Sequence, residues 1–516
     1  MMSSQRTPIV TTAAMPADWA RGSGITGRVA PPTSNVTDLV LARVVQAPTC
    51  AAFVQLEGAG TQRVSYEALA ERAGAYQRGL RAEGYAAGDR VLVIGRPSPE
   101  FYALALAVLA TGLTLVLVDS RLSADRILRA LRDARPAGVV APSALMRWWP
   151  LISALRRARR CTIGGWVPGA RPLAHLGRRT GTLDVVPVAP DAPAIASFTS
   201  GNTGQPKNIV RSHAVLLAQH RALAAAFPVG PSEVTLSAFP VAMLHNLCCG
   251  ATTVLPPAAL SADADPGALL ELVCAHRVTS LTAAPALTGL LARRALRLGT
   301  PVRALRTVVV GGGPVSPRLC DDVMRAFPAA DAHVLYGASE AEPIATARMA
   351  EVRDASGDGL LVGRPVRGTA VALAGDELLV RGAHVIGPRH HWHRTGDLAR
   401  LGDDGRVWLL GRVGSTVLHR GRVLFPFVAE AAALSVDGVC AAGLVAHRRA
   451  PEGELAIERA AGADADAVGR ALRVCLAGMG LSSLPVRMVA RVPMDARHGS
   501  KVQRAELARL LERSST

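Results

Sequence analysis

Residues 199–207, Thr-Ser-Gly-Asn-Thr-Gly-Gln-Pro-Lys, combine hydroxyl side chains, two glycines and a lysine shortly after the apolar run 194–196. The small residues of this stretch are Thr199, Ser200, Gly201, Thr203 and Gly204. A loop of such residues leaves backbone N–H groups open to phosphate oxygens, and Lys207 would add a point charge. The pattern is not a Walker A loop, because Pro206 precedes the lysine and Asn208 follows it. A polar surface turn is the alternative interpretation.

Lysine is rare in this chain. Of 58 lysines and arginines, only Lys207 and Lys501 are lysine. Lysine carries a compact ammonium on a flexible stem, whereas arginine carries a planar fork. We therefore expect that both positions need a compact positive charge.

The composition indicates a globular enzyme with a large core. The chain has 516 residues, enough for two or three domains, and 49% of them are hydrophobic. The formal net charge is +18, but the arginines are spread along the whole chain and aromatic residues make up only 4%. We therefore expect no nucleic-acid partner, with a polyanion-binding face as the alternative, and we expect the charge to attract anionic substrates.

The eight cysteines show no CxxC spacing, which predicts reduced thiols in a cytoplasmic protein and neither a disulfide framework nor a zinc site. The N-terminus lacks a sustained apolar stretch, so we expect no secretory signal. Residues 101–118 form an apolar run of membrane-spanning length, which Gly112 divides. We interpret the run as a helix followed by a buried parallel strand, and we expect no membrane span.

The periodicity predicts an α/β fold. Residues 1–35 are predicted to be disordered, and from residue 36 helical patterns alternate with short apolar strands. The predicted strands lie at 90–94, 113–118, 138–141 and 307–310. Such alternation is typical of mostly parallel sheets covered by helices. After residue 360 hairpin signals appear, with predicted strands at 377–381 and 406–410. The last hundred residues predict a small α+β domain with a strand at 438–445 and helices at 464–479 and 503–513.

From about residue 40 to the end, five motifs in order resemble the adenylate-forming (AMP-binding) superfamily, which includes acyl-CoA synthetases, peptide-synthetase adenylation domains and β-lactone synthetases. The motifs are TSGNTGQPKN at 199–208, YGASE at 336–340, TGD at 395–397, GRVG at 411–414 and Lys501 in RHGSKVQR. Asn202, Asn208, Ser339 and Gly414 depart from the usual wording. The resemblance implies a large domain at 36–411, a small mobile domain at 412–516 and a hinge at residues 412–415. Gly414 has no Cβ, so we predict that this hinge rotates freely.

The resemblance also implies ATP and Mg²⁺ as cofactors. The loop with Lys207 would hold the β- and γ-phosphates, and Ser339 would contact the α-phosphate. Glu340 would bind Mg²⁺, which prefers carboxylate and phosphate oxygens. Lys501, on the mobile domain, would close over the site and bridge the acid and the α-phosphate. Lys501, Glu340 and Lys207 are therefore the predicted catalytic residues.

The same resemblance implies a nucleoside site. Tyr336 would stack on adenine, and three glycines would let the base approach the backbone. Asp397 would accept both ribose hydroxyls, supported by Arg412. The three glycines are Gly311, Gly312 and Gly313.

The substrate would be a small carboxylic acid. His245 and Asn246 lie where the family builds its acid pocket, and they resemble a His-Asn pair of members that activate aryl acids. The alternative is a core histidine that packs beside apolar neighbours. The low aromatic content favours an aliphatic pocket.

Three functions remain open: two differ in what happens to the activated acid, and the third involves no catalysis. The commonest in the family is transfer to the thiol of CoA or of the phosphopantetheine of a carrier protein. Residues 493–507, PMDARHGSKVQRAEL, and the altered hinge resemble members that close β-hydroxy acids into β-lactones without a thiol. A non-catalytic homologue that binds ATP or an acyl group is the third alternative.

Overall fold

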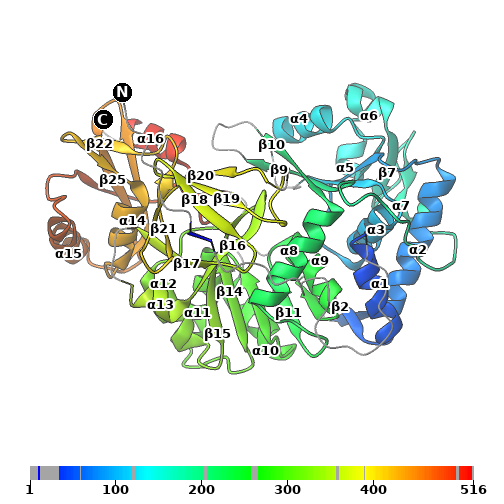
Figure 1. Ribbon diagram of the computed structural model, residues 1–516, viewed down its shortest axis with the longest axis horizontal. Coiled ribbons are helices and arrows are strands. Elements are labelled where there is room, and N and C mark those ends of the chain that lie inside the picture. Colours follow the sequence, from blue (N-terminus) through cyan, green and yellow to red (C-terminus); the bar gives the residue numbers. More distant parts are fainter. Residues whose placement is uncertain are drawn as a thin grey trace.

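The structure of the protein is a computed structural model, which describes residues 10–11, 34–57, 60–118, 123–200, 206–256, 265–355, 359–388, 390–495 and 499–513. Most of the N-terminal segment predicted to be disordered, residues 1–35, lies outside these residues. Within that segment the structure describes strand β1 (Val10–Thr11), which pairs with β18 (Ala370–Ala374). The α/β class predicted from the sequence is confirmed (Figure 1).

One sheet has seven strands in the order β10-β9-β5-β4-β6-β7-β8. All its pairs are parallel except β9 with β10. The strands are β4 (Arg90–Val93), β5 (Thr114–Leu117), β6 (Gly138–Pro142), β7 (Arg159–Ile163), β8 (Arg171–Pro172), β9 (Pro193–Ser200) and β10 (Pro206–Ser212). The helices of this region are α2 (Tyr66–Ala82), α3 (Pro99–Ala110), α4 (Ala124–Ala134), α5 (Ser143–Met146), the 3₁₀ turn Trp149–Leu151, α6 (Ser153–Arg157) and α7 (Leu173–Leu176).

The second sheet has fourteen strands, and its two halves differ in direction. From β2 to β15 neighbouring strands are parallel, and beyond β15 toward β1 every pair is antiparallel. The antiparallel pairs after residue 360 agree with the predicted hairpin signals. The remaining strands of the sheet are β2 (Ala51–Glu57), β3 (Gly60–Ser65), β11 (Val234–Ser237), β12 (Thr252–Leu255), β13 (Ser280–Ala283), β14 (Thr307–Gly311), β15 (Asp331–Ala338), β16 (Ala341–Arg348), β17 (Leu360–Pro365), β19 (Glu377–Arg381), β20 (His393–Leu401) and β21 (Val407–Arg412). The helices of this part are α1 (Thr37–Gln46), α8 (His213–Ala226), α9 (Pro240–Cys249), α10 (Pro266–Ala275), α11 (Pro285–Arg297), α12 (Pro317–Ala326) and α13 (Met349–Arg353).

The apolar run 101–118 forms helix α3 followed by strand β5, as predicted. Residues Tyr102 to Ala110 of α3 are all buried, so this helix has no polar face. The turn between helix and strand uses Gly112, whose φ of 76° is accessible to glycine at little cost. Within the described part of the chain, none of the helices combines the length and the apolar character that a bilayer crossing requires.

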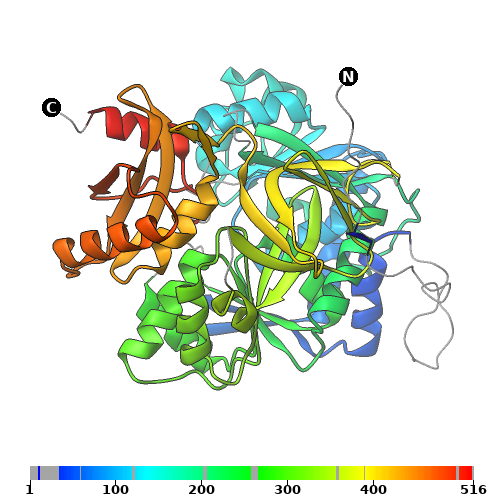
Figure 2. The same cartoon turned by 60° about the vertical axis from the view of Figure 1, so that its left-hand side comes forward.

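The C-terminal residues form a separate small sheet with three helices. The sheet contains β24 (Val439–His447), β25 (Ala450–Arg459) and β26 (Val486–Val489), preceded by the hairpin β22 (Val417–His419) and β23 (Arg422–Leu424). The helices are α14 (Pro426–Ser435), α15 (Ala465–Gly478) and α16 (Arg504–Arg513). This part, orange to red in Figure 1 and Figure 2, lies beside helices α11 and α12 of the large sheet. An ion pair of 2.6 Å joins Arg318 of α12 to Asp437. The chain passes from the large sheet to the small part after Arg412, next to the predicted hinge.

Candidate active site

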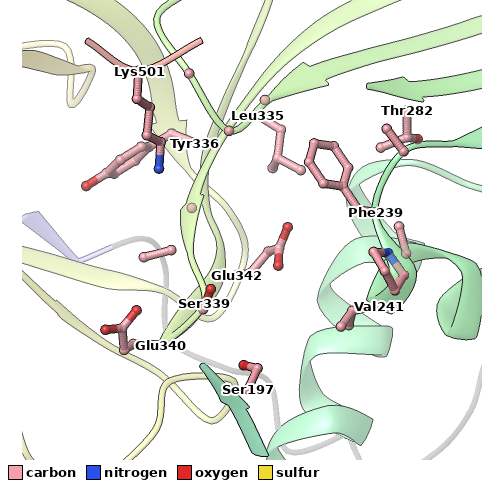
Figure 3. Close-up of a pocket in the computed structure, with 18 of the residues that line it drawn as sticks. Ser197, Phe239, Val241, Thr282, Leu335, Tyr336, Ser339, Glu340, Glu342 and Lys501 are labelled. Atoms are coloured by element: carbon pink, nitrogen blue, oxygen red, sulfur yellow. The ribbon is translucent and has the colours of Figure 1, made fainter. Parts of the chain in front are cut away.

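The predicted site residues outside the 199–207 loop line one cavity of about 2390 Å³, with walls from both the large sheets and the C-terminal part. Tyr336, Glu340, Asp397, Arg412 and Lys501 all line it. In Figure 3, Lys501 and Tyr336 lie on one side of the cavity, and Phe239 and Thr282 lie on the other. The cavity exceeds the roughly 300–1,000 Å³ of a pocket for one small ligand, so it has room for two reactants.

Ser339 and Glu340 form the tight turn of a hairpin. Strands β15 and β16 pair antiparallel with Ala338 opposite Ala341, so these two residues alone connect them. The Glu340 carbonyl accepts a hydrogen bond of 2.9 Å from the backbone of Ile386. The turn therefore has fixed backbone contacts, and Figure 3 shows both side chains beside the cavity.

Asp397 is the centre of a buried polar cluster. Its carboxylate accepts a hydrogen bond of 2.7 Å from the Tyr336 hydroxyl and one of 2.7 Å from Arg412 Nη1. The register of β20 and β21 places Asp397 directly opposite Arg412, and Thr395 Oγ1 accepts from the Asp397 backbone. Burial and the Asp397 carboxylate raise the pKa of the Tyr336 hydroxyl well above its usual value. This hydroxyl therefore stays protonated and keeps donating to Asp397.

The three glycines at the C-terminal end of β14 each have a structural reason of their own. A Cβ on Gly311 would lie 2.6 Å from the Leu335 carbonyl oxygen of the neighbouring strand, and Gly312 has a φ of 83°. A Cβ on Gly313 would lie 2.5 Å from the Ser500 Cβ of the C-terminal part. The fold and the contact between the two parts thus account for these glycines, and an approach of adenine stays a prediction.

The Lys501 loop is held against the cavity by its backbone. Asp495 Oδ1 accepts hydrogen bonds from the backbone N–H groups of Ser500 and Lys501, at 3.0 and 2.8 Å. Ser500 Oγ in turn accepts one of 3.4 Å from the backbone of Ala286 in α11. The lysine is therefore presented to the cavity by contacts that do not involve its side chain.

The predicted hinge residue Gly414 has a φ of 77°, in the left-handed region that glycine adopts readily. It belongs to a turn in which Ser415 Oγ accepts from the Arg412 backbone at 3.0 Å. A Cβ at Gly414 would meet no atom within 4 Å, so the backbone conformation and not space favours glycine here. Rotation about this point stays a prediction.

The structure describes the predicted phosphate loop, residues 199–207, only at its base. Strands β9 and β10 pair antiparallel with Lys207 opposite Thr199 and Pro206 opposite Ser200. Residues 201–205, including the predicted phosphate ligands Gly201, Thr203 and Gly204, lie outside the described residues, as do the side chains of Thr199, Ser200 and Lys207. The pairing brings the two ends of the predicted phosphate loop together at the end of a hairpin.

The predicted acid pocket contains a pair of histidines. His245 of α9 is buried, and its Nδ1 lies 3.0 Å from Nδ1 of His220 on α8, while its Nε2 lies 3.6 Å from the Cys249 thiol. Burial lowers the pKa of His220 to about 4 and that of His245 to about 3, so both rings are neutral at pH 7. Asn246, the second member of the predicted pair, donates from Nδ2 to Thr235 Oγ1 at 2.9 Å. All eight cysteines are free thiols, and Cys248 lines the cavity beside these residues.

Sequence reasoning missed several residues of the cavity wall. His220 lies 25 residues before His245 on another helix, and no spacing rule connects the two. Glu342 also lines the cavity, two residues after Glu340 (Figure 3). It is the second residue of β16, and no motif that we identified extends to it. Ser197 and Phe239 also line the cavity, and neither was among the predicted site residues.

A model of the AMP-binding enzyme family matches residues 41–387. The olefin beta-lactone synthetase of Stenotrophomonas maltophilia (strain K279a) is 29% identical over 86% of this chain and 90% of that protein. The feruloyl-CoA synthase of an Amycolatopsis species is 25% identical over 75% of this chain and 81% of that protein. The structure of ATP-bound MatB from Rhodopseudomonas palustris has the same fold, with a TM-score of 0.78, 21% identity and coverage of 94% of this chain and 100% of that one. The family match spans more than half of the chain and the fold agrees, so this protein belongs to the AMP-binding enzyme family of ATP-dependent adenylate-forming ligases.

Proposed function

We propose that the protein activates a β-hydroxy carboxylic acid as an acyl adenylate and releases it as a β-lactone. In the first step a carboxylate oxygen attacks the α-phosphorus of ATP, and the bond to the β-phosphate breaks to release pyrophosphate. Negative charge gathers on the transferring group, so positive charge fixed in the cavity lowers the barrier. Lys501 is the residue to which we assign this role, because its loop reaches the cavity from the C-terminal part.

Asp397 is the proposed ribose ligand. Its two oxygens already accept from Tyr336 and Arg412, which fixes the carboxylate plane. A carboxylate has about four lone-pair sites, so each oxygen can accept a further hydrogen bond from a ribose hydroxyl. Tyr336 would place its ring against the base while its hydroxyl holds Asp397.

Glu340 and Glu342 suit a divalent cation that accompanies ATP. Both line the cavity beside Ser339, and carboxylate oxygens are ligands that Mg²⁺ prefers. When bound there, Mg²⁺ supplies positive charge to the phosphate oxygens. We assign Ser339 to the α-phosphate and the loop around Lys207 to the β- and γ-phosphates.

The capture of the adenylate is the step that distinguishes this proposal. The β-hydroxyl oxygen attacks the acyl carbon, the bond between that carbon and the phosphate oxygen breaks, and AMP leaves. The hydroxyl proton passes to a base, for which the leaving phosphate and a neutral imidazole are both suited. His220 and His245 put a polar pair into an acyl pocket otherwise walled by residues such as Phe239 and Leu244. Such a pair can hydrogen-bond a hydroxyl and orient it.

Likeness across both parts of the chain supports thiol-free capture. The similarity to the olefin beta-lactone synthetase covers 86% of this chain, compared with 75% for the feruloyl-CoA synthase. Transfer to CoA or to a carrier protein is the second candidate, favoured by the latter relative and by a cavity with room for a second reactant.

Mass spectrometry of the products separates the two candidates. The protein is incubated with ATP, Mg²⁺ and a panel of aliphatic, β-hydroxy and aryl acids, each with and without CoA. We expect AMP, pyrophosphate and a β-lactone from β-hydroxy acids, whether CoA is present or not. A thioester that forms only with CoA would replace the proposal by the second candidate. AMP from none of the acids would contradict both.

A further inference from the structure

Residues 134–183 have an unusual charge composition. This stretch contains nine arginines and neither aspartate nor glutamate, so it supplies half of the net charge of +18. It comprises β6, α5, the turn at 149–151, α6, β7, β8 and α7. Helix α4 packs against α6 and carries three arginines and two aspartates, so it adds to the positive charge. Half of the charge excess is thus concentrated at one end of the molecule, remote from the C-terminal part (Figure 1).

The same region exposes large apolar side chains. Trp148, Leu151 and Trp166 are 56%, 75% and 73% exposed. The segments that carry them adjoin, because Trp149 Nε1, next to Trp148, donates a hydrogen bond of 2.8 Å to the carbonyl of Pro168, two residues after Trp166. A Cβ on Gly165 would lie 3.1 Å from Ser143 Oγ, so the loop that carries Trp166 crosses the start of α5.

Exposed arginines accompany these side chains. Arg147 precedes Trp148, and Arg156 and Arg157 end α6. Arg156 Nη1 donates a hydrogen bond of 3.1 Å to the Pro150 carbonyl, which connects α6 to the turn that carries Leu151. We call this set the tryptophan–arginine surface, comprising Arg147, Trp148, Leu151, Arg156, Arg157 and Trp166.

We propose that the tryptophan–arginine surface docks the protein on membranes that contain anionic phospholipids. Tryptophan settles at the boundary between headgroups and acyl chains, and arginines are attracted to the negative surface potential. A protein partner can also bury tryptophan and arginine. The absence of aspartate and glutamate from residues 134–183 favours instead a uniformly anionic surface, such as that of a lipid bilayer. Pro142, at the end of β6 and directly before α5, lines the reaction cavity. Docking would therefore bring the cavity wall close to a source of apolar acids.

Vesicle sedimentation tests the proposal without the enzymatic activity. The whole protein is mixed with vesicles of phosphatidylcholine alone or with equal parts of phosphatidylglycerol. We expect binding only to the second kind, weakened by high salt. Each arginine removed should weaken partitioning about fivefold, so the Arg147→Gln, Arg156→Gln and Arg157→Gln triple variant should lose about a hundredfold.

Matched substitutions on α15 provide the controls. Arg470→Gln with Arg473→Gln removes two exposed arginines, and Val474→Ser removes a side chain that is 74% exposed, close to the 75% of Leu151. These variants should bind like the unmodified protein, whereas Leu151→Ser and the pair Trp148→Ser with Trp166→Ser should bind less. Equal binding to both kinds of vesicle, no binding, or equal losses for the α15 variants would overturn the proposal. Capture of an acidic carrier protein without vesicle binding would overturn it as well.

Discussion

The contact between Gly313 and Ser500 provides a direct test of how the C-terminal part takes part in adenylation. Replacing Gly313 with alanine adds one methyl group at the point where the Lys501 loop meets the large sheet. That methyl carbon would lie 2.5 Å from Ser500 Cβ and 3.1 Å from the Ser500 carbonyl oxygen. Carbon atoms prefer separations of about 3.5–4.0 Å, so the loop must move away by about 1 Å.

The size of the effect follows from the cost of overpacking. An added methyl group in a tight contact costs about 1–3 kcal/mol, which corresponds to a factor of about 5 to 150 in an equilibrium. Here the cost applies only to the docked arrangement. We therefore expect Gly313→Ala to lower the rate of pyrophosphate release by about 5- to 150-fold.

A compensating substitution separates docking from nucleotide binding. Ser500→Gly removes the nearest atom and should restore part of the rate lost by Gly313→Ala. Alone, it removes the 3.4 Å hydrogen bond that Ser500 Oγ accepts from the Ala286 backbone, a long contact, and should have a small effect. The assay is pyrophosphate release with the acid of highest turnover, measured for both single variants and the double variant. If Ser500→Gly restores none of the lost rate and the affinity for ATP falls in parallel, the glycine acts on the nucleotide and the docking argument is refuted.

The other predictions concern the lysine, the hinge and two histidines whose pKa is lowered. Lys501→Ala should lower pyrophosphate release about 10²–10³-fold because one fixed positive charge is lost, while ATP affinity measured by calorimetry should persist. Gly414→Pro should abolish one half-reaction and spare the other, as separate assays of adenylate formation and product release would show. Its φ of 77° is incompatible with the proline value near −65°. Burial lowers the pKa of both His213 and His220 from 6.5 to about 4, so between these pH values the unfolded chain binds protons that the folded chain does not. Each histidine should then contribute to the free energy of unfolding in full above pH 6.5. This contribution should fall by up to about 3 kcal/mol as the pH approaches 4. Urea unfolding at several pH values measures it. His213→Asn should flatten this dependence.

Local patterns predicted the elements well. The strand predicted at 377–381 forms β19 over the same residues, and the helix predicted at 464–479 is α15 at Ala465–Gly478. The division of the run 101–118 was also predicted, because Gly112 interrupts it. These signals depend on neighbours in the chain, which a single sequence contains.

Contacts between distant segments could not be derived in this way. The bond between Tyr336 and Asp397 joins residues 61 apart, and it depends on the order of strands in the large sheet. The resemblance identified both residues but assigned them separate roles. The His220–His245 pair was missed because it depends on how α8 packs against α9, and sequence spacing does not determine that packing.

Helix α3 has a consequence for the synthesis of this protein. All its residues from Tyr102 to Ala110 are buried, and part of their cover comes from α9, where the Tyr102 hydroxyl contacts Met243. These two residues are 141 positions apart, and chains grow at about 5–20 residues per second, so α3 waits about 7 to 28 seconds for that cover. During this interval the part of α3 that α9 covers stands exposed on the ribosome, where it is open to aggregation. The nascent chain should therefore depend on chaperones, and its soluble yield should fall when synthesis is fast.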